Sequence, residues 1–156
     1  MDTNRLPGYH RLSPELFRQL GAIAQQLHAG SLGPVLVSLV EIRASQMNGC
    51  AYCLDMHARE FLAHDGDLQR LNSVATWREV PFFSERERAA LQWTESLTAV
   101  GETHAPREHF DALQAHFEPR EIAELTLAIA TINAWNRIGV GLRPPVAKKE
   151  LVPAAR

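Results

Sequence analysis

Residues 41–60 read EIRASQMNGCAYCLDMHARE, and this stretch indicates both how the chain folds and where its reactive residues lie. An apolar helical pattern that starts at Pro34 runs into the stretch and is interrupted by Asn48 and Gly49. A second helical pattern then starts at once and continues to about Gly66. The sequence therefore predicts two consecutive helices joined by a very short connection.

The second of these helices starts with two cysteines, Cys50 and Cys53, and His57 follows one turn later. The three side chains fall within roughly 60° of one another, because each helical residue advances by about 100°. At a helix N-terminus, the unpaired backbone N–H groups and the positive end of the helix dipole favour thiolate over thiol. The spacing thus predicts a reactive thiol pair with a proton acceptor beside it.

The remaining segments are also predicted to be helical, and none alternates convincingly with a period of two residues. Ser84 and Glu87 form a capping box at the start of a long helix. We therefore expect an all-α fold, a compact bundle of six or seven helices over residues 1–142, followed by a Pro-containing tail over 143–156. The other expected helices cover residues 12–29, 67–75, 106–117 and 119–138.

Composition limits the kinds of partner that the chain is expected to bind. Its 156 residues carry a net charge of -2, with 46% hydrophobic and 22% charged residues. These values describe an ordinary soluble domain without the basic surface that nucleic acid or anionic lipid requires. No apolar run approaches the roughly 18 residues that span a bilayer. We therefore expect no nucleic acid, no membrane and a cytoplasmic location, where a close cysteine pair is more often catalytic or metal-binding than structural.

Three segments carry a resemblance to a known family. Residues 41–60 resemble the redox motif of the alkylhydroperoxidase D group within the carboxymuconolactone decarboxylase family. TLAIATINAWNRIGV at 126–140 resembles the C-terminal helix of that group, and FFSERERAAL at 82–91 is similar to its smaller members. The resemblance implies an alkylhydroperoxidase D-like fold and a peroxidase that reduces hydroperoxides, with a dithiol or thioredoxin-like protein as reductant.

The resemblance also assigns roles to the thiols. Carried over to this chain, Cys53 is the peroxidatic cysteine, Cys50 is the resolving cysteine and His57 is the proton relay. The residues alone leave the order open, because the helix dipole favours Cys50 as the nucleophile. A base must reach the proton that it takes, and His57 lies one turn from Cys53 but about 10 Å along the axis from Cys50.

The chain departs from the family pattern at one position. The glutamate of the family relay aligns with Ser38, which cannot act as a carboxylate. Glu41 lies three residues later on the same helical stripe and is the predicted substitute. A solvated carboxylate, or an ion pair with Arg43 or Arg59, is an equally weighted interpretation of Glu41.

No metal and no cofactor are predicted. Zinc bound by the thiols would need a fourth ligand, and the nearest candidate, His64, lies about 10 Å beyond His57 along the helix. Asp55 and Glu60 are interpreted as exposed charges. The remaining histidines are expected to be structural or solvated rather than ligands, and this set includes His28, His64, His104, His109 and His116.

Three function classes follow from these observations. The leading hypothesis is a thiol-dependent peroxidase. The second is a redox sensor or thiol-disulfide oxidoreductase that forms the same disulfide without peroxide turnover. The third is a decarboxylase-like enzyme acting on a small lactone acid, as in the wider family. By analogy with the family, we also expect a homo-oligomer, either a trimer or a hexamer.

Overall fold

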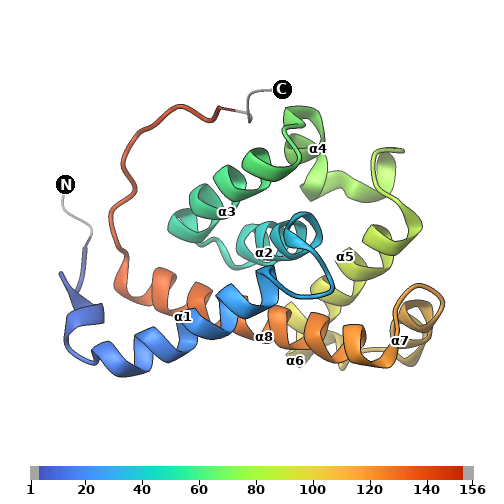
Figure 1. Cartoon of the computed structure of the whole chain (residues 1–156), viewed down its shortest axis with the longest axis horizontal. Coiled ribbons are helices and arrows are strands. Elements are labelled where there is room, and N and C mark those ends of the chain that lie inside the picture. The colour runs from blue at the N-terminus through green and yellow to red at the C-terminus, as the bar shows by residue number, and fades with distance from the viewer. Residues whose placement is uncertain (1–3, 153–156) are drawn as a thin grey trace.

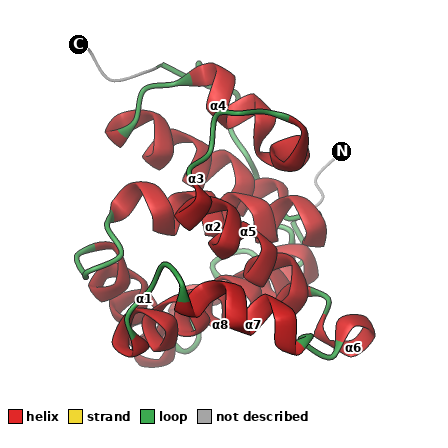
Figure 2. Cartoon of the chain, turned by 90° about the vertical axis from the view of Figure 1, so that its right-hand side faces the viewer, coloured by secondary structure: helices red, strands yellow, loops and turns green. Residues whose placement is uncertain are grey.

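The computed structural model describes residues 4–152, and within this range it contains helices and loops but no β-strand (Figures 1 and 2). The prediction of an all-α fold is therefore confirmed. Two of the helices are short 3-10 helices, η1 (Tyr9–Arg11) and η2 (Val74–Glu79). The α-helices are α1 (Pro14–His28), α2 (Pro34–Asn48), α3 (Ala51–His64), α4 (Leu68–Ser73), α5 (Glu85–Thr98), α6 (Val100–Thr103), α7 (Arg107–Gln114) and α8 (Pro119–Leu142).

Helix α2 lies at the centre of the molecule, with α3, α5 and α8 packed around it (Figure 1). Its sequence explains this position, because a helix that is apolar on all sides can be stable only when it is surrounded by protein. Nearly every residue from Leu36 to Ser45 is buried. One side of α2 joins a core shared with α5, α7 and α8, and another joins a core shared with α3, η2 and α5.

The connection between α2 and α3 is as short as the sequence predicts. Gly49 ends α2 with a φ of 68°, in the left-handed region that a residue without a Cβ enters at little cost. Cys50 follows as the N-cap of α3, and its Sγ accepts a hydrogen bond from the backbone N–H of Cys53. This tight corner places the thiol pair at the N-terminus of α3, against the centre of the fold.

Some predicted boundaries are wrong, and the described residues contain one or two more α-helices than expected. The sequence pattern does not predict α6, and α7 begins at Arg107 and ends at Gln114, before the expected residue 117. Helix α8 continues through Gly139 and Gly141 to Leu142, although glycines at these positions are typical stop signals. A glycine inside a helix costs only about 1 kcal/mol, so packing against the rest of the fold can carry α8 past it.

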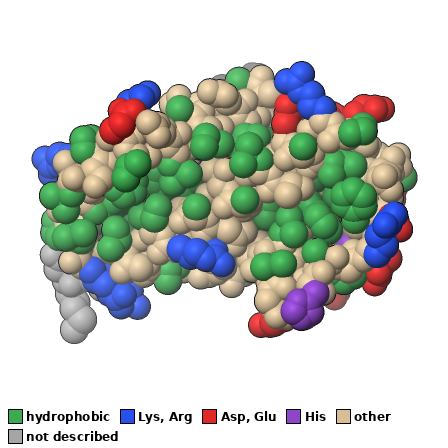
Figure 3. All heavy atoms as spheres, turned by 90° about the horizontal axis from the view of Figure 1, so that it is seen from below, with side chains coloured by type: hydrophobic (Ala, Val, Ile, Leu, Met, Phe, Trp, Pro, Cys, Tyr) green, Lys and Arg blue, Asp and Glu red, His purple; other side chains and the backbone are tan. Residues whose placement is uncertain are grey.

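The segment after α8 has no regular secondary structure up to residue 152, and it runs back past α3 (Figure 1). The guanidinium of Arg59 on α3 donates hydrogen bonds to the backbone carbonyls of Lys149 and Glu150. Within residues 4–152, no helix combines the length and the apolar character that crossing a bilayer would require. Hydrophobic side chains are spread over the face shown in Figure 3, with charged groups mainly near its edges.

Candidate functional site

The two cysteines form a disulfide bond, and both are almost completely buried, with 2% of Cys50 and 3% of Cys53 exposed. They pack against Ala44 on α2 and against Ile132 and Trp135 on α8. A pair separated by three residues encloses too short a loop to constrain the unfolded chain strongly. Its position at a helix N-terminus suits a disulfide that opens and closes during chemistry better than one that holds the fold together.

A cavity of about 830 Å³ borders this pair on one side. Cys53 contributes to its lining, whereas Cys50 is not among the lining residues. Much of the wall is apolar or aromatic, and it includes Tyr9, Phe17, Tyr52, Met56 and Trp135. The cavity therefore reaches Cys53 but not Cys50.

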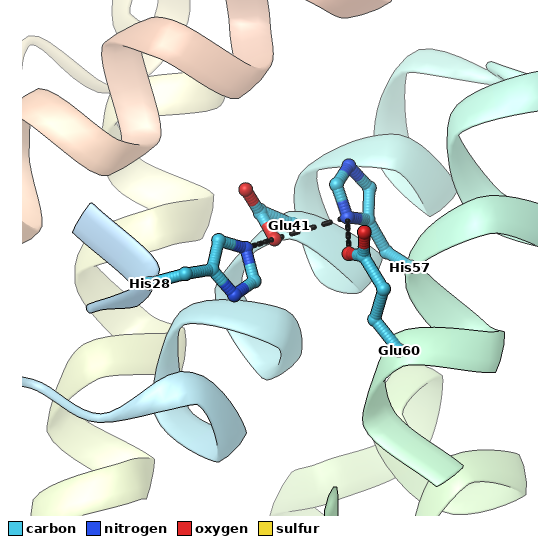
Figure 4. Close-up of side chains that lie close together, drawn as sticks. All are labelled: His28, Glu41, His57 and Glu60. Carbon is cyan, nitrogen blue, oxygen red and sulfur yellow. Dashed lines mark hydrogen bonds and ion pairs between the residues drawn. The ribbon is translucent and has the colours of Figure 1, made fainter. Parts of the chain in front are cut away.

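Four ionisable side chains meet in the same cavity, and we call them the His/Glu cluster: His28, Glu41, His57 and Glu60 (Figure 4). Oε2 of Glu41 lies 2.8 Å from Nε2 of His28 and 3.0 Å from Nδ1 of His57. Oε2 of Glu60 lies 2.7 Å from the same Nδ1. Helices α1, α2 and α3 thus contribute to one continuous chain of polar contacts.

The geometry of the cluster changes the protonation of its central members. Burial, the largest single influence, favours neutral His57, but its hydrogen bonds to Glu41 and Glu60 and their charges raise its pKa from 6.5 to about 9. Burial also favours protonated Glu41, yet hydrogen bonds to His28 and His57 hold its pKa below the ordinary value. The hydrogen bond to Glu41 raises the pKa of His28. At neutral pH, His57 is therefore an imidazolium between two carboxylates.

The structure brings all four sequence-predicted residues to this region. His57 and Glu41 are each 5% exposed and bonded to each other. The alternative ion pairs for Glu41 are not formed, because Arg43 pairs with Glu95 and Arg59 pairs with Asp55. The Oγ of Ser38, at the aligned position of the family glutamate, is buried and has no hydrogen-bond partner among the described residues.

The structure places two residues in the cluster that the sequence analysis does not assign to the site, His28 and Glu60. His28 ends α1 with its ring stacked on that of His57, the ring centroids 6.5 Å apart. Only the packing of α1 against α2 brings it near Glu41, and no local spacing signals this. Glu60 is not simply an exposed charge, since it bonds His57 while its side chain stays 41% exposed. Its position three residues after His57 is a signal that the sequence does offer.

Gly139 on α8 lies directly against the disulfide, and the sequence pattern does not single it out as part of the site. A Cβ at this position would lie 2.5 Å from Sγ of Cys50 and 3.3 Å from Sγ of Cys53. We expect Gly139→Ala to destabilise the disulfide form by about 1–3 kcal/mol, the usual cost of overpacking a rigid core. The effect is smaller in the dithiol form, because a free thiol can rotate away. Denaturant unfolding of the oxidised and reduced variant measures both values.

The matched control is Gly141→Ala in the same helix, where an added Cβ meets nothing within 4 Å. We expect that variant to be as stable as the parent protein, or slightly more stable, in both redox states. Equal effects of the two substitutions would contradict the assignment of a special role to Gly139.

Comparison with known proteins agrees with this architecture. A solved structure of a protein of unknown function from Agrobacterium tumefaciens, named as a candidate antioxidant defence protein AhpD, is 40% identical. The match covers 94% of this chain and 100% of that one, with a TM-score of 0.88. The debrominase Bmp8 matches at 20% identity over 86% of this chain and 72% of its own, with a TM-score of 0.74, which shows the fold alone.

The fold and the paired cysteines thus define an alkylhydroperoxidase D-like helical protein. The model of the carboxymuconolactone decarboxylase family matches residues 14–96, and the uncharacterized protein YdfG of Bacillus subtilis is 31% identical over 141 residues. That alignment covers 90% of this chain and 96% of YdfG. The chain belongs to the carboxymuconolactone decarboxylase family.

Proposed function

We propose that this protein is a thiol-dependent peroxidase that reduces hydroperoxides by cycling Cys50 and Cys53 between dithiol and disulfide. The observation that carries the proposal is the shared cavity, which Cys53 borders together with His57 and Glu41. Because Cys50 does not line that cavity, the geometry supports Cys53 as the peroxidatic cysteine and Cys50 as the resolving one.

Activation of Cys53 follows from the His/Glu cluster, which lines the same cavity. An ordinary thiol has a pKa of about 8.5, below the pKa of about 9 that the two carboxylates give His57. His57 is therefore already protonated when the thiol ionises, and its positive charge favours the Cys53 thiolate, whose proton leaves to solvent through the cavity. Nδ1 of His57 is held by Glu41 and Glu60, whereas its Nε2 is buried without a hydrogen-bond partner in the described residues. This nitrogen can carry the proton that His57 gives up later in the cycle.

The proposed cycle starts from the reduced protein. The Cys53 thiolate attacks the terminal oxygen of the hydroperoxide, the O–O bond breaks, and Cys53 becomes a sulfenic acid. The departing alkoxide takes a proton from His57 and leaves as an alcohol. The Cys50 thiol attacks the sulfenic sulfur, which forms the disulfide and releases water. An external dithiol supplies two electrons and two protons to restore both thiols.

The cavity lining argues against the decarboxylase-like alternative. A small lactone acid carries a carboxylate, which proteins usually bind with arginine or lysine. Among the described residues that line the cavity, none is an arginine or a lysine, and two are glutamates. The redox sensor differs from the peroxidase only in turnover. The physiological reductant and the homo-oligomer remain predictions.

Thiol titration with steady-state turnover tests the proposal. We expect one equivalent of tert-butyl hydroperoxide to remove two thiols from each reduced chain. With excess dithiothreitol, consumption should then continue over many cycles, and the Cys50→Ser/Cys53→Ser double variant gives the background rate. Loss of two thiols with turnover no faster than that of the double variant would indicate a redox sensor. An unchanged number of thiols would refute both redox functions.

A further inference from the structure

We propose that the His/Glu cluster is a binding site for one divalent transition-metal ion. Each of its members, His28, Glu41, His57 and Glu60, offers one donor atom, and these four atoms all lie within 4.8 Å of one another. The site is separate from the sulfurs, which are bonded to each other. It also goes beyond the peroxidase function, since binding requires no thiol chemistry.

The helices present these donors as a prepared set. His57 and Glu60 lie three residues apart on α3, a spacing that directs an imidazole and a carboxylate to the same side of a helix. Helical metal centres commonly use this pairing, with further ligands supplied by facing helices. Here α2 supplies Glu41 and the end of α1 supplies His28, so three helices fix the site (Figure 4).

Burial and charge both favour a cation in this position. The side chains of Glu41 and His57 are each only 6% exposed, and a buried carboxylate needs either a proton or a cation beside it. The two carboxylates together balance the charge of a divalent ion. Two imidazole nitrogens and two carboxylate oxygens form a donor set that suits zinc and cobalt, whereas calcium and magnesium prefer oxygen alone.

The ion would take the place of the protons that now link the four side chains. Those links are 2.7–3.0 Å long, whereas ligands about 2.1 Å from a tetrahedral ion lie about 3.4 Å apart. The linked atoms must separate slightly, while the most distant donor atoms, which lie up to 4.8 Å apart, must move closer together. The two outer members can make this adjustment because their side chains are 23% (His28) and 41% (Glu60) exposed. The adjoining cavity also leaves room for a water, which would be a fifth ligand.

Cobalt(II) titration of the oxidised protein, without any reductant, tests the site. Both cysteines are in the disulfide under these conditions, so neither offers a thiolate to the ion. We expect one Co(II) per chain, with visible d–d absorption that zinc(II) abolishes by competition. His28→Ala and Glu60→Gln should each weaken binding by at least about ten-fold, since mutating even an outer-shell partner of a metal ligand typically costs about that much.

The matched control is His64→Ala, which removes a histidine that lines the same cavity but stands outside the cluster. That variant should bind Co(II) like the parent protein. Thermal unfolding of each variant shows whether it is folded, and the partly exposed positions of His28 and Glu60 favour this. The proposal is wrong if no saturable binding occurs up to roughly 1 mM Co(II), or if the cluster variants bind no more weakly than His64→Ala. Either result would leave the peroxidase proposal standing, since turnover is measured separately.

Discussion

Cys53→Ser lowers the rate of hydroperoxide reduction by at least about 10³-fold, because removing the attacking atom of a covalent mechanism leaves little catalysis behind. A serine hydroxyl is a very weak nucleophile towards peroxide oxygen and has no accessible ionised form near neutral pH. The fold should be retained, since the hydroxyl occupies less volume than the thiol. The measurement is tert-butyl hydroperoxide consumption under steady-state conditions with dithiothreitol.

Cys50→Ser is the matched partner, because it removes the other sulfur of the same pair. We expect this variant to reduce one equivalent of hydroperoxide quickly and to stop at a sulfenic acid on Cys53, which dimedone traps. Cys53→Ser should give no dimedone adduct. If the adduct instead forms on Cys50 when Cys53 is replaced, the helix dipole rather than His57 selects the nucleophile, and the assigned roles are reversed.

The parts of this protein that depend on local spacing could be predicted from the sequence. The corner after Gly49, the helix that starts at Cys50 and the capping box at Ser84 all depend on residues within a few positions of one another. Such features form wherever the local pattern recurs, so they are visible without a structure. The glycine at position 139 inside α8 is different. A Cβ there would collide with the disulfide, and this contact between α8 and α3 is not recorded in the local sequence pattern.

The contacts that form the candidate site also depend on helix packing that local spacing does not reveal. Nothing within a turn of His28 indicates that Glu41, thirteen residues later on another helix, will lie 2.8 Å away. The packing angle of α1 on α2 sets that contact, and no pattern of single residues records it. Glu41 itself illustrates a partial success. Its stripe on α2 is predictable, but an ion pair with arginine is an equal alternative until the structure pairs Arg43 and Arg59 with other carboxylates.

The cluster also makes the stability of the oxidised protein depend on pH. Folding raises the pKa of His57 from 6.5 to about 9, so the folded chain holds this proton more tightly than the unfolded chain. The stabilisation is complete below pH 6.5 and is lost as the pH rises through 9. Since a ten-fold change in proton affinity is worth about 1.4 kcal/mol, the free energy of unfolding should fall by about 3 kcal/mol across this range. Glu41 acts in the opposite direction and at lower pH, because its pKa is depressed in the folded state.

His57→Gln isolates this contribution, because glutamine keeps a polar side chain and does not titrate. The free energy of unfolding, measured with urea at pH 6 and at pH 9.5, should decrease between these pH values in both proteins. The decrease should be about 3 kcal/mol smaller in the variant than in the parent protein. Titrating groups away from the cluster are common to both proteins and cancel in the difference. His28 and Glu41 do not cancel completely, because His57 itself shifts their pKa values. Equal decreases would mean that the two carboxylates do not hold the His57 proton. The thiolate would then lose its imidazolium partner at neutral pH, and activation of Cys53 would depend on the N-terminus of α3 alone.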